Sequence, residues 1–139
     1  MRIRDYQSRD FPQIEALWKD TGIYQAERGD SPALVERCNS LGGKFLVMED
    51  PDSGKIVASS WLTWDGRRIF WHHFAVLTSL QNQGYGRALA QASLAFAREK
   101  GLPVKLEVET HNQAALHFYQ SLGFEPLGDY DVYLLKPLK

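Results

Sequence analysis

The residues best able to do chemistry in this 139-residue chain lie between a short apolar run and a helix-forming segment. The apolar run Phe74-Ala75-Val76 is followed shortly by the polar stretch Gln81-Asn82-Gln83-Gly84-Tyr85-Gly86-Arg87. This pattern predicts a strand, a loop and then a helix over residues 86–100. The first N–H groups of a helix lack partners within the helix, and the helix dipole is positive at that end. Because glycines let a phosphate approach the backbone closely, we predict a phosphate or pyrophosphate site here.

Two well-known nucleotide-binding motifs do not fit these glycines. A dinucleotide fingerprint would need a third glycine at position 89, where the chain has Leu89, in a βαβ unit near the start of the fold. A P-loop would need Gly-Lys-Ser/Thr, which does not occur here. On its spacing alone, the glycine pair is equally compatible with a helix that simply starts on a glycine-rich turn.

The segments that must position these residues predict one mixed α/β domain over residues 1–139. The predicted strands are residues 2–6, 44–49, 55–64, 68–77 and 103–109, with one or two closing strands between 124 and 135. The predicted helices begin at Asp10 and at Ser31-Pro32 and run over 86–100 and 112–122. Strands 44–49, 55–64 and 68–77 are joined by turns and predict an antiparallel meander.

Two local details follow from the same patterns. Asp10, with Gln13 three residues on, predicts a capped start for the first helix. In the helix over 86–100, the spacing of apolar residues predicts one buried face, made of Ala88, Leu89, Ala92 and Phe96.

Two sequence motifs, one after the other along the chain, resemble those of a known family. The first is Phe74-Ala75-Val76-Leu77 followed by Gln81-x-x-Gly84-x-Gly86. The second is Leu106-Glu107-Val108, then Asn112-x-Ala114-Ala115-x-x-x-Tyr119-x-x-x-Gly123-Phe124. Together they resemble the acetyl-CoA motif and the second signature of the GNAT superfamily of N-acetyltransferases. The resemblance spans nearly the whole chain. It implies a mixed, mostly antiparallel sheet with helices on both faces, splayed at the cofactor-binding strands.

The resemblance implies that acetyl-CoA is the acyl donor and names the residues that would bind it. Backbone groups of Phe74, Ala75 and Val76 would bind the pantetheine arm. The loop that would wrap the pyrophosphate consists of Gln81, Asn82, Gln83, Gly84, Tyr85, Gly86 and Arg87. Asn112 would bond the cofactor, or serve only as a helix N-cap. Thr78 stands where many members carry a proline, which could loosen the loop.

The resemblance also implies direct attack of a neutral amine on the thioester. Tyr119 matches the general acid of the family, with a core tyrosine as the alternative. The base stays open between Glu107, His72 and a water relay, since each of these two residues could also be purely structural. If side chains alternate along the strand, His73 points to the face opposite His72, so the two histidines should not both serve.

The acceptor is less well specified, and we expect the primary amine of a small molecule or of a peptide N-terminus. In the family, the loop between the two early helices helps to form the acceptor site, and here it carries Tyr24, Glu27, Arg28 and Asp30. Four aromatic residues of the middle strands could hold a cation through their rings or simply form a core: Trp61, Trp64, Phe70 and Trp71.

Composition limits the other classes of function. Lys and Arg number 16 against 17 Asp and Glu, a net charge of −1, which disfavours nucleic-acid binding. No apolar run is long enough to predict a membrane span, and the N-terminal residues lack a secretory apolar region. The lone Cys38 excludes an intrachain disulfide, so we expect the reducing cytoplasm. His111 and His117 lack ligand spacing, so no metal is expected.

The main expectation is therefore an N-acetyltransferase. The alternative is a non-catalytic acyl-CoA-binding module that acts as a sensor or partner domain. Tyr119 and Glu107 favour catalysis, because a module without catalysis needs neither residue. A homodimer formed through edge strands is compatible with the sequence, which does not decide the oligomeric state.

Overall fold

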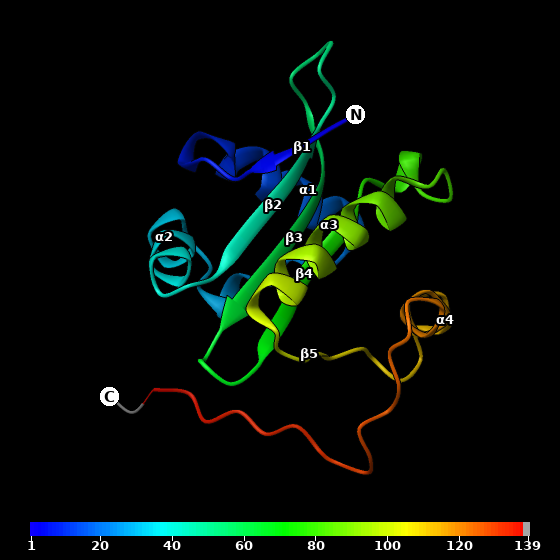
Figure 1. Ribbon diagram of the computed structural model, residues 1–139. Coiled ribbons are helices and arrows are strands. Elements are labelled where there is room, and N and C mark those ends of the chain that lie inside the picture. The colour runs from blue at the N-terminus through cyan, green and yellow to red at the C-terminus, as the bar shows by residue number, and fades with distance from the viewer. Residues whose placement is uncertain (138–139) are drawn as a thin grey trace. The chain divides into compact units, whose positions relative to one another are not determined.

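The computed structural model describes residues 1–137, and the chain divides into two compact units, Met1–Glu107 and Val108–Lys139. The first unit holds a five-stranded sheet in the order β1-β2-β3-β4-β5 (Figure 1). Its strands are β1 Arg2–Asp5, β2 Lys44–Glu49, β3 Ile56–Trp64, β4 Ile69–Val76 and β5 Val104–Leu106. Its α-helices are α1 Phe11–Thr21, α2 Pro32–Ser40 and α3 Tyr85–Lys100. Short 3-10 helices are η1 Ser8–Asp10, η2 Ala26–Arg28 and η3 Thr78–Leu80.

The sheet is antiparallel from β1 to β4, and β5 joins β4 in parallel. Side chains alternate between its faces, since Phe45 of β2 belongs to one buried cluster and Leu46 to the other. The first cluster includes Trp18 of α1 and Val35 of α2, and the second includes Leu89 of α3. Figure 1 shows α3 crossing the near face of the sheet with α1 behind it. This arrangement confirms the expected mixed sheet with helices on both faces.

The buried face of α3 differs from the prediction. Ala88 is exposed and Phe96 only half-buried, whereas the fully buried residues are Leu89, Ala90, Ser93 and Ala97. The Ser93 hydroxyl lies 2.6 Å from that of Ser60 in β3, which explains why a polar residue belongs to this face. Small side chains and a buried hydroxyl pair bring α3 close to the sheet.

The second unit contains α4, Gln113–Ser121, and residues 124–137 form no strand. The prediction of one or two closing strands is therefore wrong. A strand needs a neighbour for its backbone hydrogen bonds, and none exists within residues 108–137 of this unit. β5 is also shorter than the predicted 103–109, because its pairing with β4 extends over only three residues of each strand.

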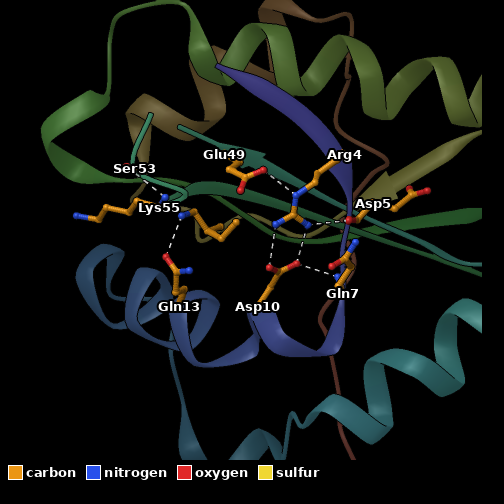
Figure 2. Close-up of polar contacts among 9 residues, drawn as sticks. Arg4, Asp5, Gln7, Asp10, Gln13, Glu49, Ser53 and Lys55 are labelled. Atoms are coloured by element: carbon orange, nitrogen blue, oxygen red, sulfur yellow. Dashed lines mark hydrogen bonds and ion pairs between the residues drawn. The ribbon is translucent and has the colours of Figure 1, made fainter. Parts of the chain in front are cut away.

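A partly buried ion-pair cluster links β1 to β2 and to the start of α1 (Figure 2). Arg4 donates to both carboxylate oxygens of Asp10, at 2.8 and 2.9 Å, and to Glu49 at 2.9 Å. Asp10 also accepts the Gln7 N–H at 2.8 Å and is 3% exposed. Burial by itself raises the pKa of Asp10, but the hydrogen bonds from Arg4 and Gln7 outweigh it, so the pKa is lowered.

The predicted capping partnership of Asp10 with Gln13 is wrong. Gln13 instead accepts the N–H of Ile56 at 3.0 Å, which fastens α1 to the start of β3 (Figure 2). Asp10 precedes α1 as expected, but its side chain bonds Arg4 rather than the first turn of that helix. Among residues 1–137, we find no helix with the length and apolar character needed to cross a bilayer.

We predict that Asp10→Asn lowers the free energy of unfolding by about 3 kcal/mol at pH 7, because the largely buried Arg4 guanidinium then keeps Glu49 but loses the Asp10 carboxylate as a partner. The stabilisation is present above the unfolded pKa of about 4 and is lost as the pH falls through the lower folded value. Denaturant unfolding at pH 7 and pH 3 measures both effects. Asp5→Asn is the control, since the Asp5–Lys44 pair is exposed. Equal stability of the two variants at pH 7 would contradict the prediction.

Candidate active site

The site is organised by an irregularity in β4. Between the pairs Trp61↔His72 and Ser59↔Ala75, β4 contains one residue more than β3. This extra residue makes a β-bulge, which bends the strand and changes where its side chains point. Within the bulge, His73 has a φ of 46°, a left-handed conformation that residues with a Cβ atom rarely adopt.

The hydroxyl of Ser59 stabilises the bulge from β3. It donates to the carbonyl of His73 at 2.8 Å and accepts from Nε1 of Trp18 at 3.0 Å. Ser59 and Trp18 are both fully buried. One hydroxyl therefore links α1, β3 and the bulged residue of β4, and each of its bonds satisfies a polar group that water does not reach.

The bulge places both histidines on the same face of the sheet. The ring of Trp61 lies 6.2 Å from that of His72 and 5.4 Å from that of His73. The expectation that the two histidines point to opposite faces is therefore wrong, because simple alternation holds only along a regular strand. This face is the one covered by α1, since Trp18 lies 4.4 Å from the His73 ring.

β4 and β5 part at the same point. Their pairing ends at Trp71↔Leu106, although β4 continues to Val76. The residues that follow the last pair are His72 and Glu107, the two residues that the sequence indicated as candidate bases. In a parallel pair, equivalent residues point to the same face, so both side chains start on one face where the strands separate. Glu107 is exposed there.

His72 is held in its neutral form. Its Nε2 atom lies 2.8 Å from Oγ1 of Thr63, and its ring stacks 6.3 Å from Phe70. Removal from water, followed by the nearby His73 and Arg28, lowers the pKa of His72 to about 4. The residue is nevertheless exposed to solvent, which weakens the effect of burial, but a histidine with the ordinary pKa is also mostly neutral at pH 7.

His73 pairs with a residue of the segment between α1 and α2. Its Nε2 atom lies 3.1 Å from Oδ2 of Asp30, and both side chains are nearly buried, at 11% and 15% exposed. Nη1 of Arg28 lies 3.5 Å from the same nitrogen and donates to the Ile23 carbonyl at 3.1 Å. The predicted acceptor segment therefore contacts β4 at the bulge. The contact between His73 and Asp30 could not be predicted from the sequence, because no local pattern indicates the bulge.

The aromatic residues of the middle strands serve mainly as core. Trp61 and Trp71 are each 4% exposed, and Trp71 donates to the hydroxyl of Ser60 at 2.7 Å. Trp64 is 37% exposed and lies beneath Lys100 of α3, whose Nζ is 5.0 Å from the ring. Trp61 still borders the two histidines, so this core reaches the candidate site.

The start of α3 has the backbone expected of an anion site. Gly84 precedes the helix with a φ of 89°, Asn82 has a φ of 64°, and no side chain caps the first turn. A Cβ atom built on Gly86 would lie 3.4 Å from Cγ2 of Val76, so the helix begins directly against β4. Uncapped N–H groups on a glycine turn can bind a pyrophosphate. The start of α3 is therefore compatible with the acetyl-CoA donor that the resemblance implies.

The loop before α3 is anchored at two points. Gln81 donates through Nε2 to the carbonyl of Val76 at 2.9 Å. Asp20 at the end of α1 accepts the N–H and the hydroxyl of Thr78, at 2.9 and 2.8 Å. These two bonds also lower the pKa of Asp20. Thr78 therefore fastens the loop to α1, contrary to the loosening expected where relatives carry proline. Arg87 is exposed on the first turns of the helix.

In the second unit, Asn112 caps α4 by accepting the N–H of Ala115 at 3.1 Å. The ring of Tyr119 lies 5.5 Å from that of Phe118 and 5.8 Å from that of Phe124. Burial raises the pKa of Tyr119 to about 12, so its hydroxyl stays protonated near neutral pH. In the described part of the chain, no three His, Cys, Asp or Glu side chains gather as metal ligands would.

Residues 2–124 match the Acetyltransferase (GNAT) family. This chain belongs to that family. The match covers most of the chain and includes both signatures on which the resemblance rested. It confirms the family that the sequence pattern indicated, and acetyl transfer is the chemistry of that family.

Relatives found by sequence similarity are named as acyltransferases or acetyltransferases. The chain is 32% identical over 113 residues to the L-amino acid N-acyltransferase MnaT of Escherichia coli, an alignment that covers 78% of this chain and 64% of MnaT. It is 26% identical over 126 residues to the acetyltransferase YE1169 of Yersinia enterocolitica, which covers 90% of this chain and 88% of that protein.

Solved structures share the fold. An acetyltransferase from Streptococcus agalactiae superposes with a TM-score of 0.80 at 18% identity and covers 98% of this chain and 91% of its own. The ribosomal-protein-S18-alanine N-acetyltransferase of Escherichia coli gives a TM-score of 0.74 at 22% identity, over 89% and 77% of the two chains. At this level of identity the likeness shows the GNAT fold alone.

We predict that Gly84→Ala weakens acetyl-CoA binding about tenfold, because a Cβ in the left-handed region costs about 1–2 kcal/mol and would deform the start of α3. Gly84→Asn should bind more tightly than Gly84→Ala, because asparagine tolerates this conformation. Isothermal titration calorimetry measures the dissociation constants.

Gly66→Ala is the matched control for this experiment. Gly66 also has a φ of 89°, and neither glycine has an atom within 4 Å of a built Cβ. Both alanine variants should lose similar stability, but only the variant at position 84 should lose affinity. Equal losses of affinity would assign the effect to general strain.

Proposed function

We propose that this GNAT chain transfers the acetyl group of acetyl-CoA to the primary amine of a small molecule or a peptide N-terminus by direct attack. One observation carries the proposal: β4 and β5 separate immediately beside His72 and Glu107, and the uncapped start of α3 lies against the same strand β4. A thioester held along β4 would thus meet polar side chains suited to proton transfer. We further propose that residues 1–139 act as one catalytic domain in the cytoplasm.

The donor would lie along the free edge of β4. Leu77 N–H bonds the Val57 carbonyl on the β3 side, so by alternation Val76 turns its backbone groups to the other edge, where Gln81 meets its carbonyl. Phe74 and Val76 are therefore better placed than Ala75 to bond a pantetheine arm. Residues 82–87 would bind the pyrophosphate through backbone N–H groups, and Asn112 would add a side-chain contact.

Tyr119 is the proposed general acid toward the departing sulfur. With a pKa of about 12 against about 8.5 for a thiol, full transfer to a free thiolate would be uphill by about 5 kcal/mol. A tyrosine of this kind acts by donating its hydrogen bond as negative charge develops on the sulfur, before the thiolate is free. The high pKa also keeps the donor protonated over the working pH range.

The demand on a base depends on the acceptor. A lysine-like amine is neutral in about one molecule in 10³ at pH 7, a cost of about 4.6 kcal/mol, whereas an α-amine costs about 1.4 kcal/mol. We propose that Glu107 and His72 flank the amine and take part in moving its proton. The name of MnaT supports an α-amine of an amino acid as the acceptor, which is also the less demanding case.

We predict that Tyr119→Phe lowers amine-dependent thiol release from acetyl-CoA at least about tenfold, because the developing thiolate loses its donor. The assay mixes protein, acetyl-CoA and pools of amines that include free amino acids and short peptides. Tyr133→Phe is the control, since that side chain is 89% exposed. Acetyl-CoA binding without thiol release from any pool would instead favour the non-catalytic acyl-CoA-binding module.

A further inference from the structure

We propose that His73, held by Asp30, takes the proton of the acceptor amine through one water molecule bound between His73 Nδ1 and Trp61 Nε1. The inference rests on the proposed function, because it assigns a residue to one step of that reaction. It places the proton acceptor at the bulged residue of β4, next to His72.

The first observation is a pair of buried nitrogen atoms. Within residues 1–137, neither Nε1 of Trp61 nor Nδ1 of His73 has a hydrogen-bond partner. Trp61 is 4% exposed, and the two rings lie 5.4 Å apart. A buried polar group left unpaired is destabilising, so two such groups on neighbouring rings indicate a bound polar group. An indole N–H can only donate, and a water molecule can accept that bond and donate another to the imidazole.

The second observation sets the tautomer of His73. Its Nε2 atom lies closer to the Asp30 carboxylate, at 3.1 Å, than to the Arg28 guanidinium, at 3.5 Å. A carboxylate only accepts hydrogen bonds, so Nε2 carries the proton and Nδ1 keeps its lone pair. Nδ1 is then able to accept a proton from the bound water. Asp30 is a positioning residue: it orients the ring and lies where it offsets the charge of the protonated imidazole.

The third observation is the backbone of His73. A non-glycine residue in the left-handed region is strained, and such strain is found mainly at functional sites. A glycine would form this bulge without that cost. The strained backbone is held by the Ser59 hydroxyl and the side chain by Asp30, so two separate elements keep an imidazole at this position.

The surroundings distinguish His73 from its neighbour. The charged and titratable groups that face the His73 ring are Asp30, Arg28 and His72. No carboxylate among the described residues contacts His72, whose Nε2 is already engaged by Thr63. His72 can therefore contact the amine or relay its proton, whereas His73 is in direct contact with the Asp30 carboxylate, which can balance the charge that His73 acquires.

The amine nitrogen forms its bond to the acetyl carbon while the bond from that carbon to sulfur breaks, and the electron pair leaves with sulfur. The surplus proton on nitrogen passes to the water, which gives one of its own protons to His73 Nδ1. Tyr119 keeps its proton and donates a hydrogen bond to the sulfur, which leaves as thiolate, and His73 later releases its proton to solvent.

Variants that spare the backbone test the proposal. His73→Asn removes the imidazole, and asparagine tolerates the left-handed conformation. Asp30→Asn keeps the shape and removes the charge. We expect His73→Asn to lower kcat about 100-fold with the acetyl-CoA Kd unchanged within about twofold. We expect Asp30→Asn to lower kcat about tenfold and to shift the acidic limb of the kcat/KM profile against pH, with partial recovery in Asp30→Glu.

A purely structural role for Asp30 would change KM and unfolding but not the acidic limb. Turnover of His73→Asn within about threefold of the wild type would overturn the proposal and leave the proposed function standing. A wild type that releases no thiol with any amine would overturn the proposed function itself. Nitrogen-15 NMR of the histidine rings above pH 8 gives a readout without acceptor: a proton on Nε2 of His73 supports the proposal, and a proton on Nδ1 overturns it.

Discussion

The hydroxyl of Ser59 is the interaction on which the candidate site depends most. A hydroxyl can accept and donate at once, and this one accepts from Trp18 while donating to the carbonyl of His73. It thereby fixes the position of α1 and the extra residue of β4 in a single buried contact. Because of that extra residue, two histidines share one face. Without the extra residue, β4 would be regular, and only one of the two histidines would lie beside Trp61.

Much of the fold could be predicted from the sequence, since it follows from local patterns. The apolar runs in 44–49 and 55–64 indicate strands, the residues between them indicate a turn, and Pro32 after Ser31 indicates a helix start. The errors arose where tertiary contacts override local patterns. Gln13 accepts a hydrogen bond from the N–H of Ile56, which is distant in the sequence, instead of capping the helix together with Asp10. Ser93 is buried because Ser60 lies opposite it. The spacing of apolar residues predicts neither of these partners, Ile56 for Gln13 or Ser60 for Ser93.

The residues of the candidate site, too, could be predicted from the sequence only in part. The loop from Gln81 to Arg87 and the capping role of Asn112 could be recognised from residue types, because uncapped helix starts and glycine turns have clear signals. The participation of His73 could not be recognised, since a bulge has no signature in a single sequence. Asp30 was visible as a charged loop residue, but its partner became known only when the loop was seen to contact β4.

The tail after α4 has a physical consequence of another kind. Val132, Tyr133, Leu134 and Leu135 are consecutive in the sequence and form an apolar run. Such a run of β-forming side chains is a template for aggregation when the protein is concentrated. The chain flanks it with Asp131 on one side and with Lys136 and Pro137 on the other. Charges and a proline at these positions act as gatekeepers, because they oppose the stacking of further strands onto the segment.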